Sequence, residues 1–218
     1  MNPSSLEQFI ENNQLSEIAE ILQKKPQLAT ETTSHGISPL LLAAYYNRPE
    51  MAKVIAGFVP EISMAEACAL GRFEDVTLLI FKDPQLLNQH DESGFTPLGI
   101  ACYFGHEEIV RFLIMKGADV NMASKNGFNV FPIHSAVAAN NISITRLLFE
   151  AGAYPNVCQK SGMAPLHSAA SLGNIELIIL LLEHGAEVNL RMEGGKLPAD
   201  LAAEKGFTEI AGILRDDD

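Results

Sequence analysis

The chain has 218 residues, of which 27 are acidic and 15 are basic, so its formal net charge is −12. This charge argues against nucleic acid and against an anionic membrane surface as partners, because both are themselves negatively charged. Hydrophobic residues make up 47% of the chain and charged residues 19%, which excludes a disordered protein and is enough for a large core.

The cysteines and the N-terminus indicate where the protein resides. Cys68, Cys102 and Cys158 are far apart and form no CxxC pair, as expected for free thiols in a reducing compartment. The first residues lack the basic and apolar segments of a secretory signal. The richest apolar run, 177–182, is far shorter than the about 20 residues of a membrane span. We therefore expect a soluble cytoplasmic protein.

Proline residues mark an internal repeat. Pro39, Pro97, Pro132, Pro165 and Pro198 lie in the similar segments SPLLLAA, TPLGIAC, FPIHSAV, APLHSAA and LPADLAA, and the last three are evenly spaced along the chain. The longer step from the first proline to the second leaves room for a shorter unit, and a matching short unit opens the chain. We therefore predict one domain, 1–218, of seven units. Their approximate bounds are 1–33, 34–62, 63–90, 91–123, 124–157, 158–190 and 191–218.

Each unit is predicted to begin with a helix of about two turns that starts at the proline position. Ser38 and Thr96 precede the proline as N-caps, and Ser5 and Ser63 replace it in the short units. Eight residues after the proline position every unit has Gly or Asn, which best tolerate the left-handed conformation that ends a helix. These residues are Asn13, Asn47, Gly71, Gly105, Asn140, Gly173 and Gly206.

A second helix follows in each unit, with an aliphatic residue at one shared position. This column is Ile21, Ile55, Leu79, Leu113, Leu148, Leu181 and Leu214. One helix pair cannot bury both of its faces alone, so neighbouring pairs must stack into a solenoid.

Two stretches carry a recognisable motif. The segment 91–106 reads DESGFTPLGIACYFGH and is followed by KGADVN, and SGMAPLHSAASLGN is followed by EHGAEVN. These residues resemble the ankyrin repeat, whose pattern is roughly D-x-x-G-x-T-P-L-H-x-A-A-x-x-G-H, an apolar helix and G-A-D-V-N. The resemblance spans the chain and implies an all-α ankyrin solenoid of stacked helix-turn-helix units. Units one and three lack the long turn, and polar faces on the terminal units lead us to expect a complete domain.

No residue pattern indicates a catalytic or metal-binding site. His134 and His167 share a column, but adjacent helices lie about 8–10 Å apart, whereas zinc needs ligands at about 2.0–2.1 Å. In the family that the chain resembles, this His hydrogen-bonds within its turn. The sequence has no phosphate-binding loop, nucleophile elbow or HExxH motif. We therefore expect a protein that is not an enzyme and has no catalytic residue, metal or cofactor.

The two positions before each Gly or Asn stop vary between units. In proteins that the chain resembles, these positions face the concave groove, which the turn tips flank. The central ones are apolar, and Tyr is favoured at interfaces because it offers a large contact area and a polar tip. The predicted partner-binding residues are Tyr45, Tyr46, Leu70, Phe95, Tyr103, Phe104, Phe128 and Leu172. The alternative is that turns or neighbouring side chains cover these rings.

The sequence therefore favours a non-catalytic interaction module that binds a protein or peptide in its concave groove, as a regulator or inhibitor. One alternative is a small-molecule sensor or minor enzyme, which a deep pocket with convergent polar groups between units would favour. Another is a structural protein that self-associates through its tyrosines. We expect a monomer, with self-association left open.

Overall fold

The computed structural model describes residues 6–215, which form fourteen α-helices, two 3-10 helices and no strand. The α-helices are α1 (Leu6–Glu11), α2 (Leu15–Lys24), α3 (Pro39–Tyr45), α4 (Pro49–Ala56), α5 (Met64–Ala69), α6 (Phe73–Lys82), α7 (Pro97–Phe104), α8 (Glu107–Met115), α9 (Pro132–Ala138), α10 (Ile142–Glu150), α11 (Pro165–Leu172), α12 (Ile175–Glu183), α13 (Pro198–Glu204) and α14 (Thr208–Ile213). The 3-10 helices are η1 (Pro26–Thr30) and η2 (Pro84–Asn88). Ser5, predicted as a cap, and the acidic 216–218 lie outside the described residues. None of the described helices has the length and hydrophobicity to cross a membrane.

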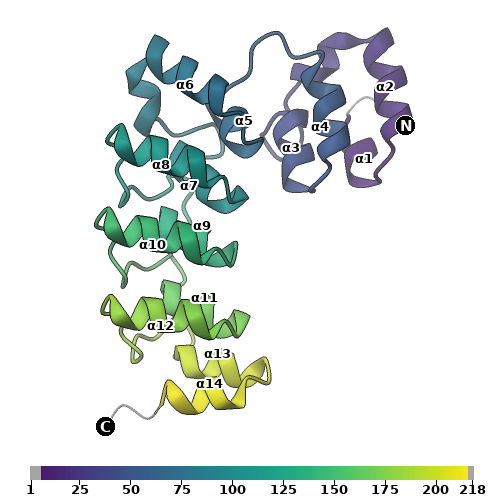
Figure 1. The fold of residues 1–218 in the computed structure, drawn as a ribbon. Coiled ribbons are helices and arrows are strands. Elements are labelled where there is room, and N and C mark those ends of the chain that lie inside the picture. The colour runs from purple at the N-terminus through teal and green to yellow at the C-terminus, as the bar shows by residue number, and fades with distance from the viewer. Residues whose placement is uncertain (1–5, 216–218) are drawn as a thin grey trace.

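The helix pairs α5–α14 stack into one column, with the first helices in one layer and the second helices in another (Figure 1). The pairs α1–α2 and α3–α4 stand beside the top of this column. Helix α3 contacts α5, but α4 and α6 do not pack together as α6 and α8 or α8 and α10 do. The solenoid therefore bends between its second and third units.

The predicted helix boundaries are confirmed. Ser38, Ser63 and Thr96 each accept a hydrogen bond from the backbone N–H three residues later, which caps α3, α5 and α7. All seven residues of the Gly/Asn column have a positive φ, from 52° at Asn47 to 86° at Gly206. The first helix of every unit thus ends in the left-handed conformation that the column predicts.

The predicted core column of the second helix is wrong by one residue in the two short units. Ile55, Leu113, Leu148, Leu181 and Leu214 are buried as expected. Ile21 and Leu79 are only half-buried, and the residues after them, Leu22 and Ile80, are buried. The reason is local, because α2 and α6 are followed by the 3-10 helices η1 and η2, whereas the regular units continue into a glycine-containing loop.

The long turns of units four to seven are joined edge to edge by backbone hydrogen bonds. The donor is always the second residue of a turn, and the acceptor is a carbonyl of the preceding turn. The bonds run from Lys125 N to Gly94 O (2.7 Å), from Lys160 N to Phe128 O (2.9 Å) and from Glu193 N to Ser161 O (2.8 Å). Units one and three have no such turn, so this ladder is interrupted in the N-terminal half.

Candidate functional site

Three aromatic rings pack together across the short third unit. Tyr45 ends α3, and Tyr103 and Phe104 end α7. The ring centroids of Tyr45 lie 5.9 Å from Tyr103 and 5.1 Å from Phe104, and Tyr103 meets Phe104 edge-on at 5.2 Å. The equivalent position of the third unit is the small Ala69, so rings from the two flanking units can meet over it. We call Tyr45, Tyr103 and Phe104 the aromatic cluster.

The aromatic cluster is partly open to solvent. Tyr103 is 47% exposed, whereas Tyr45 and Phe104 are half-buried. Burial, with help from nearby Asp91 and Tyr103, raises the pKa of Tyr45 to about 12, so its hydroxyl stays protonated at neutral pH. The cluster therefore offers apolar ring surface with hydroxyl groups that can donate hydrogen bonds.

The other predicted site residues lie outside these ring contacts. Tyr46 turns toward the first unit, where its hydroxyl donates to Glu11 Oε1 at 3.3 Å. Leu70 and Phe95 are half-buried against the core, and Phe128 and Leu172 are exposed in units five and six. The structure thus brings three of the eight predicted residues into mutual ring contact and places the other five around or away from them.

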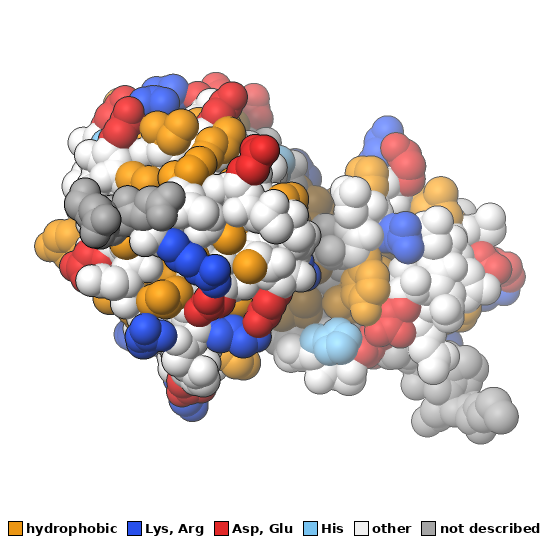
Figure 2. All heavy atoms as spheres, turned by 90° about the horizontal axis from the view of Figure 1, so that it is seen from below, with side chains coloured by type: hydrophobic (Ala, Val, Ile, Leu, Met, Phe, Trp, Pro, Cys, Tyr) orange, Lys and Arg blue, Asp and Glu red, His pale blue; other side chains and the backbone are white. Residues whose placement is uncertain are grey.

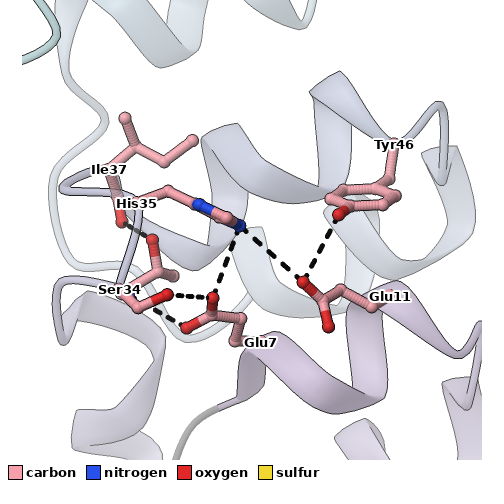
Figure 3. A network of polar contacts seen from close by, with 7 residues as sticks. Glu7, Glu11, Ser34, His35, Ile37 and Tyr46 are labelled. Atoms are coloured by element: carbon pink, nitrogen blue, oxygen red, sulfur yellow. Dashed lines mark hydrogen bonds and ion pairs between the residues drawn. The ribbon is translucent and has the colours of Figure 1, made fainter.

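A polar network that the sequence did not predict surrounds the turn of the second unit (Figure 3). Ser34 donates its backbone N–H to Glu7 Oε2 at 2.9 Å and its hydroxyl to Glu7 Oε1. His35 Nε2 lies 3.4 Å from Glu7 Oε1 and 3.7 Å from Glu11 Oε1. The bonds from Ser34 lower the pKa of Glu7, although burial opposes this. Residues 27 positions apart carry the network, so no local motif reveals it.

Glu7, Glu11 and His35 could also be considered as metal ligands, because their ligand atoms lie within 4.8 Å of one another. Both carboxylate oxygens of Glu7 already accept hydrogen bonds from Ser34. Glu11 and His35 are exposed, and exposed ion pairs of this kind are common on protein surfaces. The network is explained by its role in holding the turn, and the absence of a metal site stays a prediction.

The two column histidines have structural partners. His134 Nδ1 accepts the backbone N–H of Phe131 at 3.2 Å, within its own turn, as the family resemblance implies. Its Nε2 bonds to the carbonyl of Met163 in the next turn at 3.1 Å, and His167 repeats both contacts one unit later. Burial lowers the pKa of His134 to about 4, so it is neutral at pH 7. These side chains join neighbouring units.

A hollow of about 350 Å³ lies between the turn of the second unit and the turn of the fourth. Its lining includes Ile37, Ser38, Ala65, Asp91 and Phe95. It exists because the third unit has no long turn to fill the space between its neighbours. Figure 2 shows the molecule narrowing where the first two units meet the column. The volume is at the lower end of the range for small-molecule sites, which is about 300–1,000 Å³.

The polar groups in this hollow differ in how well they are satisfied. The Glu66 carboxylate accepts the Ser38 hydroxyl at 2.5 Å and the Ser63 N–H at 2.8 Å. Asp91 Oδ1 accepts the Phe95 N–H at 2.7 Å, but the buried Asp91 Oδ2 and Ser93 Oγ complete no hydrogen bond. Burial raises the pKa of Asp91, and the nearby N–H and hydroxyl groups of Phe95 and Ser93 oppose part of this rise.

Comparison with known proteins places most of the chain in one family. The family model for ankyrin repeats in three copies matches residues 64–158 and 133–218. The match therefore covers units three to seven, and the helix pairs α1–α2 and α3–α4 lie outside it.

Three relatives illustrate what the chain is similar to. The chain is 33% identical over 102 residues to human BCL-6 corepressor-like protein 1, which covers 47% of this chain and 6% of that protein. It is 43% identical over 65 residues to mouse protein phosphatase 1 regulatory subunit 27, and the match covers 30% of this chain and 42% of that protein. It is 28% identical over 165 residues to the probable 26S proteasome regulatory subunit p28 of Saccharomyces cerevisiae, and the match covers 70% of this chain and 72% of that protein. The chain thus spans less than half the length of the first two.

Proposed function

This chain belongs to the ankyrin repeat family, and we propose that it is a non-catalytic interaction module that binds a protein or peptide at the aromatic cluster. Two of its relatives are described as regulatory subunits, one of a phosphatase and one, as probable, of the proteasome. By analogy, we propose that this chain regulates a larger protein assembly. The analogy supplies the class of partner and leaves its identity to experiment.

The exposure of Tyr103 is the observation that carries this proposal. Its ring is held by Tyr45 on one side and Phe104 on the other, yet nearly half of its surface faces solvent. A ring that is already fixed loses little conformational entropy when a partner covers it. Rigid, partly exposed aromatic side chains of this kind are typical binding hot spots.

Substitution of Tyr103 by Ser tests the proposal. Proteins captured from native lysate by the wild-type chain should be retained by Phe81→Ser and lost by Tyr103→Ser. Phe81, on α6, is the matched control because it is an aromatic residue that is 86% exposed, but it lies in the layer of second helices. Calorimetry with the captured partner should show a loss of at least about 2 kcal/mol for Tyr103→Ser. Equal affinity of wild type and Tyr103→Ser would exclude the aromatic cluster as the binding site.

We also propose a cytoplasmic, monomeric protein. The three cysteines are free, and Cys68 and Cys102 are buried, which raises the pKa of Cys68 to about 12 and that of Cys102 further. Such thiols are inert and need no oxidising compartment. Light scattering on the purified chain tests the monomeric state, and a dimer that Tyr103→Ser dissolves would favour self-association instead.

A further inference from the structure

The second unit shows what happens to a long turn that has no preceding turn to bind. In the column, the second residue of each turn donates its N–H to the turn before it, as Lys125 does to Gly94. In the second unit the equivalent residue is Ser34, and the first unit has no turn. The Glu7 carboxylate takes the place of the missing carbonyl and accepts the Ser34 N–H at 2.9 Å.

The third unit also lacks a turn, but it supplies no such substitute. The same alignment that places Pro39 on Pro97 places Glu7 on Ala65 and Ser34 on Glu92. Ala65 lines the hollow, and its side chain has no group that could accept a hydrogen bond. The N–H of Glu92 accordingly has no hydrogen-bond partner among residues 6–215. A backbone donor is therefore unused at the edge of the fourth turn, where the third turn would lie.

The second turn, on the other side of the hollow, has an unused acceptor. The Gly36 carbonyl occupies the position of Gly94, which accepts the bond from the next turn in the column. In the described part of the chain, Gly36 O accepts no hydrogen bond. Glu92 lines the hollow, and Gly36 directly precedes Ile37, which also lines it. One main-chain donor and one main-chain acceptor therefore lie at or beside the gap, and these are the groups that an inserted stretch of main chain would use.

The charges in the hollow define the side chain that such a segment would carry. Its lining includes Glu66, Asp91 and Glu92 and contains no Lys or Arg. Asp91 Oδ2 and Ser93 Oγ are buried and complete no hydrogen bond of normal geometry, although the Ser93 hydroxyl lies near the Asp91 carboxylate, and about nine in ten buried polar groups in proteins are fully bonded. A cationic side chain would satisfy these atoms and match the negative charge.

We propose that the hollow between the second and fourth turns binds an extended segment of a partner protein, whose main chain replaces the missing third turn and whose Lys or Arg side chain reaches Asp91. This interaction goes beyond the aromatic cluster, because it uses different residues and different chemistry. An extended peptide fits better than a small molecule, since the unused groups are the two main-chain edges that a turn would join.

The probe is a phage-displayed library of random heptapeptides, selected on the full chain. The selected peptides should share a Lys or Arg. Synthetic copies, measured by fluorescence anisotropy, should bind Ala65→Glu at least about tenfold more weakly, because this variant copies Glu7 and supplies the missing acceptor internally. Asp91→Asn should weaken binding to a similar extent, because it removes the charge and keeps the size of the side chain.

Two control variants separate this proposal from the proposed function. Ile179→Ser changes an exposed apolar residue of α12, far along the column, and should leave peptide affinity unchanged. Tyr103→Ser should also retain the peptides, even though it loses the lysate partner. The proposal is overturned if the library yields no binders, if the binders share no basic residue, or if Asp91→Asn binds them like the wild type. The last criterion holds even if Ala65→Glu fails to fold.

Discussion

From residue 91 onward neighbouring units are joined by backbone groups, Asn side chains and His rings, whereas the first two units are joined through a carboxylate. In the column, Asn121 donates to Gly152 O and accepts the N–H of Tyr154, at 2.9 and 3.0 Å. Between the first two units, the link is the Glu7 carboxylate, which accepts the Ser34 N–H and lies beside His35. Neighbouring units are therefore held together by two different kinds of contact within one chain.

The difference follows from the turns. A regular unit has a long turn whose backbone groups bind the next turn, so its side chains are free to vary. A unit without a turn must replace those backbone groups with a side chain or leave them unused. The first unit uses Glu7, and the third unit, with Ala65, leaves a hollow. Absence of the same element is thus accompanied by a polar side-chain contact at one junction and by a hollow at another.

The largest expected effect is the loss of stability when a core leucine of a second helix is shortened. Leu113→Ala should destabilise the protein by about 2–5 kcal/mol, because it opens a cavity at a fully buried position. Leu79→Ala, at the same column position in a short unit, should cost less, because Leu79 is only half-buried. Urea unfolding of both variants measures the difference. Equal losses would show that the short units pack their second helix as the regular ones do.

The next effect separates the two regions by pH. The pKa of His134 is about 4 in the folded chain and 6.5 when unperturbed, so its stabilising effect is complete above pH 6.5 and is lost as pH falls toward 4. The full loss is about 3 kcal/mol. Denaturant unfolding at a series of pH values between 7 and 4 should show it. His134→Gln should be less stable at pH 7, but its free energy of unfolding should change less between pH 7 and 4. If it changes with pH as steeply as in the wild type, His134 is not the group that causes the loss.

A smaller effect tests the left-handed positions. Gly105 has φ 77°, and its nearest neighbour would lie 3.5 Å from an added Cβ, so Gly105→Asn should be tolerated. Gly105→Val should cost about 1–2 kcal/mol because a β-branched residue resists positive φ. Gly71→Asn should be worse than Gly105→Asn, because its Cβ would lie 2.7 Å from the ring of His106. Melting temperatures rank the three variants, and the opposite order for the two Asn variants would reject this reasoning.

The smallest effect is local to the first two units. The pKa of Glu7 is below its usual 4.5, so the stability that it contributes is present above pH 4.5 and is lost as pH falls through the lower folded value. Hydrogen exchange at the Ser34 amide should therefore lose protection in acid. Glu7→Gln should be less protected at neutral pH and should show little further change. Undiminished protection in this variant would mean that the carboxylate is not what holds the turn.

Most of the fold could be predicted because the repeat fixes it at positions of simple chemistry. Proline begins the first helix, Gly or Asn ends it, and these requirements recur whatever the neighbours are. The core shift at Ile21 and Leu79 escaped prediction because a column counted along the sequence does not register the 3-10 helices that follow. The role of Asn88, whose Oδ1 accepts the Asp119 N–H at 3.0 Å, could have been found, since Asn121 occupies the same column one unit later.

The candidate sites were less predictable for a physical reason. Tyr45 and Tyr103 occupy the same column, so their nearness could be inferred from the repeat. The contact of Tyr46 with Glu11 and the hollow beside Asp91 depend on the bend and on an absent turn, which leave no positive signal in the sequence.

The bend between the second and third units also bears on cooperativity. A repeat array is held together by the intrinsic stability of each unit and by the interfaces between nearest neighbours. At this junction α3 meets α5 and Ser38 bonds to Glu66, but α4 and α6 do not pack together as α6 and α8 do. This junction divides the array into one block that contains α1–α4 and another that contains α5–α14. We therefore expect the two blocks to unfold in separate transitions, so that a single melting temperature would be an average of the two. Residues 57–63 connect the blocks, and a protease that cuts there should separate two blocks that are both still folded.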